Sequence, residues 1–409
     1  KTHPFVTFII KDFLSVISEF KKMIVSNIDT WSNLEVALGQ KTTALGFNRG
    51  TQLVKQTGSS MKPLAVVAPG IDKGIITAAT VYDDVPYLGK KNYNYFKGLL
   101  TIRHAIESSQ NIPMVKGIQA IGTEKALEFV KTLGFEHLDD EYDNSINLSL
   151  GGLRNGATPL EMAAAYGAIA NDGVYIEPTF YTKVVDGDGN IVLEPTQETR
   201  TVMSKAAAYV VKEVLTQPVK SGTATNCYIS GMSVAAKTGT SNYPDSVLKE
   251  KRLPANAVND LWTVAYTPKH SIALWYGYDE VSSEYYSTVG TPKDNLMAAI
   301  MKYIPVTTAP FNQPSSVIAA KVESETWPAQ SPSEFTPPAL IKTEYFISGT
   351  EPTETSKRFS TLDNVTNLKA SSTSDGIKLT WTHKKPDVIS EEYLKKYFSQ
   401  SVFGHSAAK

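Results

Sequence analysis

Three short strings in this sequence carry residue types suited to acyl transfer through a serine. They are Ser59-Ser60-Met61-Lys62, Ser109-Gln110-Asn111 and Lys237-Thr238-Gly239-Thr240. A serine hydroxyl is a weak nucleophile at neutral pH and needs a neighbouring base to take its proton. On a helix, residues three positions apart share a face, so Lys62 can reach Ser59 but not Ser60. We therefore predict Ser59 as the nucleophile and Lys62 as its base.

A lysine acts as a base only where its pKa is lowered by burial or by a nearby cation, and Lys237 is the candidate for that cation. Gly58 allows the chain to turn into a helix at Ser59, where the positive end of the helix dipole favours a developing oxyanion. We expect the backbone amides of Ser59 and Thr240 to form an oxyanion hole.

The third string follows a small apolar run, Met232 to Ala236, which is typical of a buried strand. Leu261–Tyr266 and Ser271–Tyr276 are predicted to form a hairpin beside it. The edge of such a strand can align an extended peptide by β-addition, and Gly239 would leave room for the peptide backbone. We predict that Lys237, Thr238 and Thr240 then bind a substrate carboxylate.

Two predicted helices place these strings. One begins near Thr101 and ends at Ser108–Pro113, where the proline disfavours further helix, so Ser109 and Asn111 should lie on a turn. The other begins at Thr158, where Pro159 and Glu161 complete a capping box, and it runs to Ala170.

Bulk composition excludes several classes of function. The net charge is −1 over 409 residues, so no basic excess indicates a nucleic-acid partner. The single cysteine, Cys227, and the spacing of the six histidines indicate no metal site, and no cofactor motif is present. Asp186 to Asn190 begins like a calcium loop, but Ile191 stands where the turn glycine should be, which favours a hairpin turn.

The two ends of the chain differ from its middle. Apolar residues recur at helical spacing from Phe5 to Phe20, which predicts a helix docked on the domain, with a helix at the membrane surface as the alternative. No run approaches the ~18 apolar residues of a membrane span. Prolines punctuate residues 306–358, which predicts an extended region or a linker. Val365–Ala370 and Ile377–Thr382 alternate apolar and polar residues around a turn, the pattern of a β-hairpin.

From residue 1 to about 355 the chain resembles the transpeptidase part of class A, bifunctional penicillin-binding proteins, most similar to those of Gram-positive bacteria. The order S-x-x-K, S-x-N, K-T-G carries the resemblance. Four further segments add to it: Phe47–Gln52, Tyr95–Arg103, Gly156–Ala163 and Phe346–Pro352.

The resemblance implies an α+β fold of the penicilloyl-serine transferase type, an antiparallel sheet flanked by helices, with a small C-terminal β-rich appendage. We expect a linker helix over residues 1–30, a transpeptidase domain over 31–358 that ends in the proline-rich stretch 306–358, and the appendage over 359–409. The first two strands of the tail are similar to the start of a fibronectin type III module, but too few residues remain for its seven strands. The segment Asn27 to Lys41 matches the family poorly.

By the same resemblance, Ser59 attacks the D-Ala-D-Ala bond of a peptidoglycan stem peptide and passes the acyl group to an amine on a neighbouring stem. Lys62 is the general base, Ser109 relays a proton to the leaving amine, Asn111 binds the substrate amide, and Thr238 and Thr240 bind the carboxylate. β-Lactam antibiotics would acylate the same serine.

The family works at the outer face of the cell membrane with other cell-wall synthesis proteins. We expect a membrane anchor and a glycosyltransferase domain before residue 1, so that the sequence as given is a soluble fragment.

Three alternatives share these motifs. A D,D-carboxypeptidase would transfer the acyl group to water. A serine β-lactamase would need a separate glutamate to activate water, and the nearest match, Glu107 with Asn111, overlaps the S-x-N string itself. A non-enzymatic β-lactam sensor would bind covalently without turnover.

Overall fold

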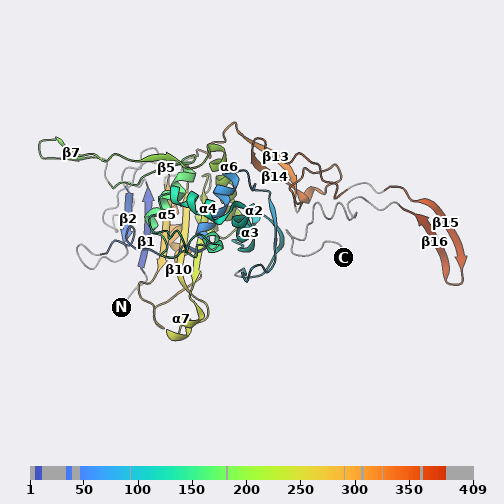
Figure 1. The fold of residues 1–409 in the computed structure, drawn as a ribbon, viewed down its shortest axis with the longest axis horizontal. Coiled ribbons are helices and arrows are strands. Elements are labelled where there is room, and N and C mark those ends of the chain that lie inside the picture. Colours follow the sequence, from blue (N-terminus) through green and yellow to red (C-terminus); the bar gives the residue numbers. More distant parts are fainter. Residues whose placement is uncertain are drawn as a thin grey trace.

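The computed structural model describes residues 5–11, 34–38, 47–92, 94–180, 183–289, 291–304, 308–324, 326–359 and 363–383. A six-stranded antiparallel sheet forms one layer (Figure 1). Its strands are β1 (Phe5–Lys11), β2 (Leu34–Leu38), β9 (Ala235–Asn242), β10 (Ala257–Tyr266), β11 (Ser271–Gly277) and β12 (Ser287–Thr288). β10 lies beside β11 along one edge and β9 along the other, and β11 continues through β1 to β2.

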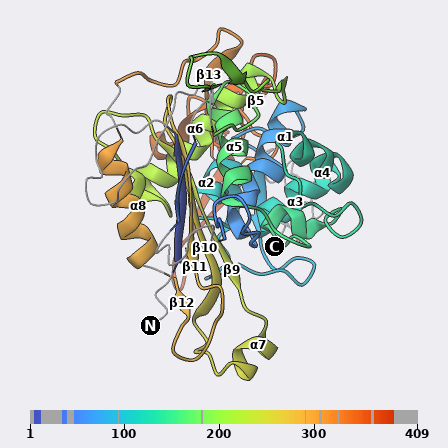
Figure 2. The same ribbon diagram turned by 90° about the vertical axis from the view of Figure 1, so that its left-hand side faces the viewer.

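Helices cover both faces of this sheet (Figure 2). The helices of the described residues are α1 (Ala68–Asp72), α2 (Ile102–Glu107), α3 (Ile112–Ile121), α4 (Thr123–Thr132), α5 (Pro159–Ala170), α6 (Lys205–Ser221), α7 (Asp245–Glu250) and α8 (Thr291–Tyr303), of which α7 lies beyond the end of the sheet. Figure 2 shows α8 on one side of the sheet and α3, α4 and α5 on the other. The structure thus confirms the predicted antiparallel sheet flanked by helices.

Alternating residues of the central strands explain the two covered faces. Trp262 and Val264 of β10 belong to the large apolar cluster that also contains α5. Ala265, between Val264 and the strand end, faces the other way and packs in a second cluster with Met297 and Met301 of α8. The sheet is therefore buried on both sides at β10, the strand that supports β9.

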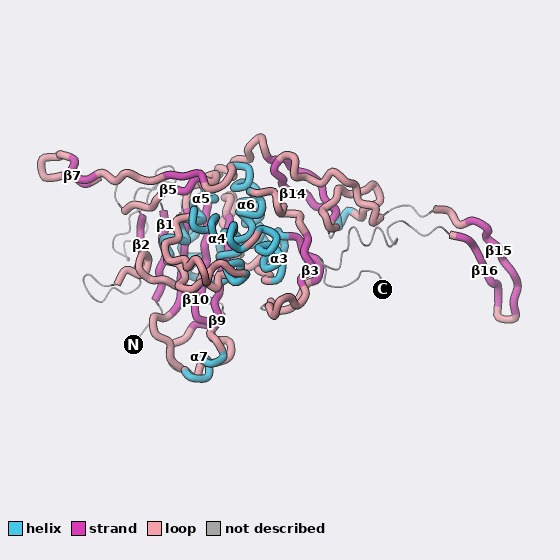
Figure 3. The backbone as a smooth tube through the Cα atoms, in the orientation of Figure 1, coloured by secondary structure: helices cyan, strands magenta, loops and turns pink. Residues whose placement is uncertain are grey.

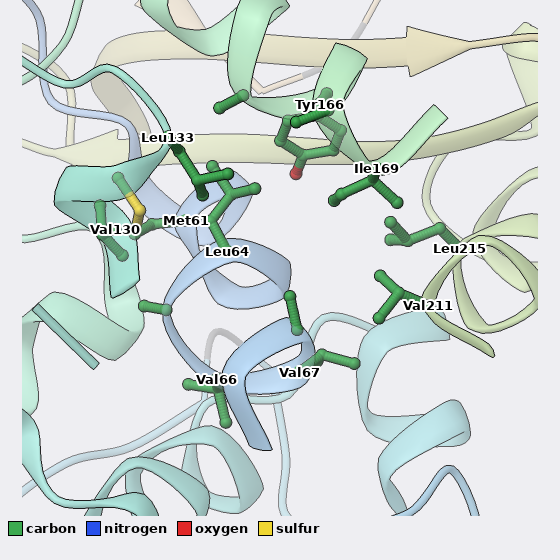
Figure 4. Close-up of a cluster of buried hydrophobic side chains, with 14 of the residues drawn as sticks. Met61, Leu64, Val66, Val67, Val130, Leu133, Tyr166, Ile169, Val211 and Leu215 are labelled. Atoms are coloured by element: carbon green, nitrogen blue, oxygen red, sulfur yellow. The ribbon is translucent and has the colours of Figure 1, made fainter. Parts of the chain in front are cut away.

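The core is built around the helix that carries the first string. It starts as a 3-10 helix at Gly58–Met61, continues through a π-helical segment at Pro63–Val67 and ends as α1. Every side chain from Met61 to Ala68 is buried. Figure 4 shows Met61, Leu64, Val66 and Val67 among side chains of the surrounding helices, including Tyr166 and Val211. A helix whose side chains are apolar on nearly every face must lie inside the protein. Its burial fixes the position of Ser59, which precedes the buried segment.

The predicted helix over Thr158 to Ala170 is confirmed as α5. The Thr158 side chain accepts a hydrogen bond from the Glu161 amide, and Glu161 accepts one from the Thr158 amide, so the capping box is complete. β10 and β11 are confirmed as the predicted hairpin, in which Trp262 pairs with Trp275.

The helix predicted over Phe5 to Phe20 is wrong where the structure describes it, because Phe5–Lys11 forms strand β1, paired with β11 and β2. Residues 12–20 lie outside the described part of the chain. Phe5 to Ile10 is a short run rich in aromatic and β-branched residues, and such a run fits a buried strand as well as a helix face. Pairing with the open edge of β11 decides between them. The doubtful segment Asn27 to Lys41 contributes β2.

The proline-rich stretch 306–358 is more than an extended linker. Within it, β13 (Val317–Glu323) and β14 (Ile341–Ile347) form an antiparallel hairpin. Val322 and Phe346 are buried with Ala79 in a small apolar cluster. The prediction for this stretch rested on its many prolines, and it therefore missed two strands that lie between the proline-containing turns.

An ion pair joins this hairpin to the helix that precedes the second string. Arg103 of α2 donates two hydrogen bonds of 2.6 Å to the two carboxylate oxygens of Glu344 on β14. A third bond of 2.6 Å runs from Arg103 to the carbonyl of Glu213. Both charged side chains are largely buried, so each depends on the other.

Small two-stranded sheets complete the described structure (Figure 3). They are β3 (Val81–Asp84) with β4 (Gly98–Thr101), β5 (Val174–Ile176) with β8 (Thr199–Thr201), β6 (Val184–Val185) with β7 (Ile191–Leu193), and β15 (Thr366–Thr373) with β16 (Gly376–Thr382). The turn between β6 and β7 is the predicted hairpin turn at Asp186, whose carboxylate accepts hydrogen bonds from the Asp188 and Asn190 amides. The predicted hairpin in the tail is confirmed as β15–β16. No helix in the described residues is long and apolar enough to cross a membrane.

We predict that Glu344→Ala lowers the free energy of unfolding by about 3–5 kcal/mol, because it leaves the Arg103 charge buried without its partner. Chemical unfolding followed by circular dichroism measures this change. Glu128→Ala, at an exposed position of α4, is the control and should have almost no effect. The double variant Arg103→Met/Glu344→Met should lose less than Glu344→Ala, and an equal or larger loss would contradict this account.

We propose that residues 359–409 form a separate appendage, because β15 and β16 are exposed along their whole length. Truncation after Phe359 is predicted to leave the melting temperature of the rest and the rate of Ser59 acylation almost unchanged. Differential scanning calorimetry and labelling with a fluorescent penicillin would measure the two quantities. A large loss of labelling in a truncated chain that still melts cooperatively would show that the appendage belongs to the site.

Candidate active site

Ser59 and Ser60 have different surroundings. The Ser60 hydroxyl is buried and donates a 2.6 Å hydrogen bond to the Thr57 carbonyl. Ser59 is partly exposed and lines a cleft of about 1000 Å³. The structure thus favours the same serine that the helical spacing favours.

Three contacts hold the start of the Ser59 helix in place. The Tyr166 hydroxyl of α5 donates a 2.7 Å bond to the Ser60 carbonyl. The Trp262 indole of β10 donates a 2.8 Å bond to the carbonyl of Gln56, just before the helix. Gly58 has a left-handed φ of 53° and lies against β9, where an added Cβ would come within 2.2 Å of the Thr240 carbonyl oxygen. Only glycine fits there.

Gly239 is the β9 residue in the same contact between this strand and the Ser59 helix. An added Cβ on Gly239 would lie 2.3 Å from the Thr57 carbonyl oxygen and 2.9 Å from the Ser60 hydroxyl. We expected this glycine to leave room for substrate backbone. The structure gives another reason, since the space is filled by the protein's own chain.

The remaining residues of the third string alternate along β9. Thr238 and Thr240 line the cleft with Ser59, and the Thr238 hydroxyl donates a 2.9 Å bond to the Thr223 hydroxyl. Lys237 and Gly239 lie on the opposite face of the strand, where Lys237 reaches Ser109 and Gly239 lies against the Ser59 helix. The strand therefore presents hydroxyls to the cleft and its lysine to Ser109, which lines the same cleft.

The Lys62 ammonium is completely buried. Its nitrogen donates hydrogen bonds to the Ser109 carbonyl at 2.6 Å and to Asn111 Oδ1 at 2.7 Å, and lies 3.5 Å from Ser109 Oγ. Burial, and after it the charge of Lys237, holds the pKa of Lys62 well below its ordinary value, while the charge of Asp84 acts in the opposite direction. In the described part of the chain Lys62 bonds to the S-x-N residues, and Ser59 is not among these partners.

Lys237 approaches the same serine from β9. Its nitrogen donates a 2.7 Å bond to Ser109 Oγ and a 2.9 Å bond to the Thr238 carbonyl. Burial, followed by the charge of Lys293, lowers the pKa of Lys237 to about 7. Two buried lysines thus converge on one hydroxyl, and the charge of Lys237 disfavours the charged form of Lys62. Lys293 donates a 3.0 Å bond to the Thr263 hydroxyl on the neighbouring strand β10.

Ser109 is held in a strained turn. α2 ends at Glu107, α3 begins at Ile112, and Ser109 between them has a φ of 58°. A non-glycine residue in this region costs about 1–3 kcal/mol and persists only where the surroundings enforce it. The turn was predicted, but Pro113 does more than stop a helix, because it lies in the first turn of α3.

The structure therefore brings together all eight residues proposed from the sequence. Sequence reasoning missed three residues behind Asn111. Lys91 and Asn92 accept hydrogen bonds from Asn111, and Asp84 accepts a hydrogen bond from Asn92. The only signal was an acidic pair at the end of an apolar run, Asp83-Asp84.

Two competing chemistries find no support in the described residues. The Glu107 carboxylate accepts a 2.7 Å bond from the Ser221 hydroxyl and does not line the cleft that holds Ser59. No group of three or more histidine, cysteine or acidic residues in the described ranges is placed to hold a metal ion.

Comparison with known proteins agrees with this geometry. The model of the penicillin binding protein transpeptidase domain matches residues 36–302, and that of the penicillin-binding protein 1A C-terminal domain matches residues 313–361. Penicillin-binding protein 1A/1B of Bacillus subtilis (strain 168) is 31% identical over 333 residues, which are 79% of this chain and 36% of the relative. Penicillin-binding protein 1A of Clostridium botulinum (strain Hall) is 33% identical over 338 residues, 76% of this chain and 38% of the relative. The chain thus spans little more than a third of these relatives.

Solved structures share the fold. Penicillin-binding protein 1A from Haemophilus influenzae superimposes with a TM-score of 0.64 at 20% identity, covering 86% of this chain and 54% of the other. The PonA1 protein from Mycobacterium tuberculosis, in complex with penicillin V, gives a TM-score of 0.57 at 21% identity, covering 76% and 81%.

We predict that Lys237→Met moves the acid limb of the pH profile of Ser59 acylation to higher pH. Acylation needs neutral Lys62, and without the neighbouring cation Lys62 holds its proton to higher pH. Stopped-flow acylation by a chromogenic cephalosporin between pH 5 and 10 measures the limb. Lys125→Met, at an exposed position of α4, should leave it unchanged. An unmoved limb, or one moved to lower pH, would contradict the coupling.

Proposed function

Because this chain belongs to the penicillin-binding protein transpeptidase family, we propose that it cross-links peptidoglycan stem peptides as a D,D-transpeptidase. One observation carries the proposal: Lys62 and Lys237 converge on Ser109, which lines the same cleft as Ser59. This arrangement supplies a nucleophile, a buried lysine whose neutral form is favoured, and a hydroxyl that can pass a proton.

In the first half of the reaction, Ser59 Oγ attacks the carbonyl carbon of the D-Ala-D-Ala bond, and its proton passes to neutral Lys62. The amides of Ser59 and Thr240 stabilise the oxyanion. The close approach of Gly58 to Thr240 supports this role, since it brings the two backbones together. When the tetrahedral intermediate collapses, the C–N bond breaks and the leaving amine takes the proton from Lys62 through Ser109.

The second half repeats these steps with an acceptor amine. The amine attacks the ester carbonyl, its proton passes through the same groups, and Ser59 leaves with a proton to regenerate the free enzyme. Thr238 and Thr240 bind the terminal carboxylate of the donor, and Asn111 binds its amide. Their position along the cleft supports this assignment.

A β-lactam acylates Ser59 by the same first half, and its ester is long-lived because the sequence offers no recognisable glutamate to activate a deacylating water. The place of Glu107 outside the cleft supports this. A D,D-carboxypeptidase would share all of these groups and differ only in using water as acceptor. We place the site at the outer face of the cell membrane, where peptidoglycan lies, and the relatives from Bacillus and Clostridium favour a Gram-positive source.

We predict that Ser59→Ala abolishes penicillin labelling. Ser60→Ala should retain much of it, because the Ser60 hydroxyl is buried and bonded to the Thr57 carbonyl. Lys62→Ala should also fail to label, since the hydroxyl remains but its base is gone. Mass spectrometry of the tryptic peptide from Gln56 to Lys73 locates the adduct, because Pro63 blocks cleavage after Lys62. An adduct on Ser60, or none on this peptide, would overturn the assignment.

The same preparations separate the two acceptors. Synthetic stem pentapeptide is incubated with and without D-amino acid as acceptor amine, and the products are resolved by mass spectrometry. A transpeptidase forms the exchanged peptide in competition with the shortened one. Shortened peptide alone at every acceptor concentration would identify a carboxypeptidase, and no turnover of any stem would identify a sensor.

A further inference from the structure

A buried pair of polar side chains lies behind the S-x-N turn. Asp84, at the end of β3, is fully buried, and Asn92 is 7% exposed. Asn92 Nδ2 donates hydrogen bonds of 2.8 Å to both carboxylate oxygens of Asp84. The Lys97 amide donates a further 2.9 Å bond to Asp84 Oδ2. A buried carboxylate needs such donors, so the pair is fixed as a unit.

The other end of Asn92 holds Asn111. Asn92 Oδ1 accepts a 2.8 Å bond from the Asn111 backbone amide. The next residue back in the chain, Lys91, accepts a 2.7 Å bond from Asn111 Nδ2 through its carbonyl. Both the backbone and the amide nitrogen of Asn111 are therefore bound to residues 91 and 92.

These bonds decide which atom of Asn111 meets Lys62. An amide side chain can present either its oxygen or its nitrogen to a neighbour. With Nδ2 bound to the Lys91 carbonyl, Oδ1 is the atom left to accept the 2.7 Å bond from Lys62. The reversed amide would set a donor against the Lys62 nitrogen.

We propose that Asn92, anchored by Asp84, is a positioning residue that holds the Asn111 carbonyl oxygen against the Lys62 nitrogen and so aligns Lys62 with Ser59. This inference rests on the proposed function for the catalytic roles of Lys62 and Asn111. It adds Asp84 and Asn92, which belong to none of the three motifs, to the residues that hold Lys62 in position.

The first test is a double-mutant cycle on the rate of Ser59 acylation by a chromogenic cephalosporin. Asn92→Ala is expected to lower this rate by up to about 100-fold, the effect of misplacing a reacting group by an ångström. In the Asn111→Ala background the same substitution should cost less than 3-fold, because the group it positions is already gone. Asn226→Ala, at an exposed asparagine that does not line the cleft, is the matched control and should keep the parent rate.

The second test guards against simple unfolding. Asn92→Asp sets two carboxylates against each other, whereas Asp84→Asn/Asn92→Asp exchanges donor and acceptor and restores the pair, with an oxygen still facing the Asn111 amide. The swapped variant is expected to recover at least 10-fold of the rate lost in Asn92→Asp at pH 7. Melting temperatures of all variants accompany the rates.

Additive effects of Asn92→Ala and Asn111→Ala, or a swapped variant no better than Asn92→Asp while both remain folded, would overturn the proposal. Failure of the proposed function is recognised separately in the parent chain, which would then form no exchanged stem peptide or would not be acylated at Ser59 at all. Hydrogen exchange at the Asn111 amide would still test the positioning in that case. Asn92→Ala should speed that exchange at least 10-fold, and unchanged exchange would refute the role of Asn92.

Discussion

The site depends on the burial of two lysine ammonium groups against a single serine. Lys62 and Lys237 are both fully buried, and their nitrogens lie 3.5 Å and 2.7 Å from Ser109 Oγ. Removing an ammonium from water is costly, and a second ammonium nearby adds to that cost, so the pair releases a proton easily. That release makes a lysine usable as a base at neutral pH. The Ser59 helix, the Ser109 turn and β9 hold these groups in place.

The fold supplies that placement through close contact of main chains. Gly58 and Gly239 let the Ser59 helix and β9 approach until no side-chain atom fits between them at these points. The apolar helix from Met61 to Ala68 anchors the serine from behind, and the strained turn at Ser109 directs both its oxygens to the lysines. The Arg103–Glu344 ion pair joins α2, the helix before that turn, to the β13–β14 hairpin. A hairpin that contains none of the three motifs thus helps to hold the helix that leads to Ser109.

Local chemistry made much of this readable from the sequence. Helical spacing separated Ser59 from Ser60, and the capping box at Thr158 predicted the start of α5 correctly. Tertiary contacts account for the failures. The strand at Phe5–Lys11 is selected by pairing with β11, which its own periodicity does not reveal. The strands within the proline-rich stretch were hidden by composition, and the role of Asn92 depends on a neighbour, Asp84, whose contacts no motif records.

The central claim concerns the protonation of Lys62, and nuclear magnetic resonance measures it directly. Protein carrying lysine labelled with ¹³C at Cε is titrated from pH 5 to 11, and Lys62→Met identifies the resonance. The account predicts that Lys62 titrates well below its ordinary pKa of 10.5 and that Lys237→Met raises that pKa. A Lys62 resonance that titrates at the ordinary value, whether or not Lys237 is present, would contradict the account.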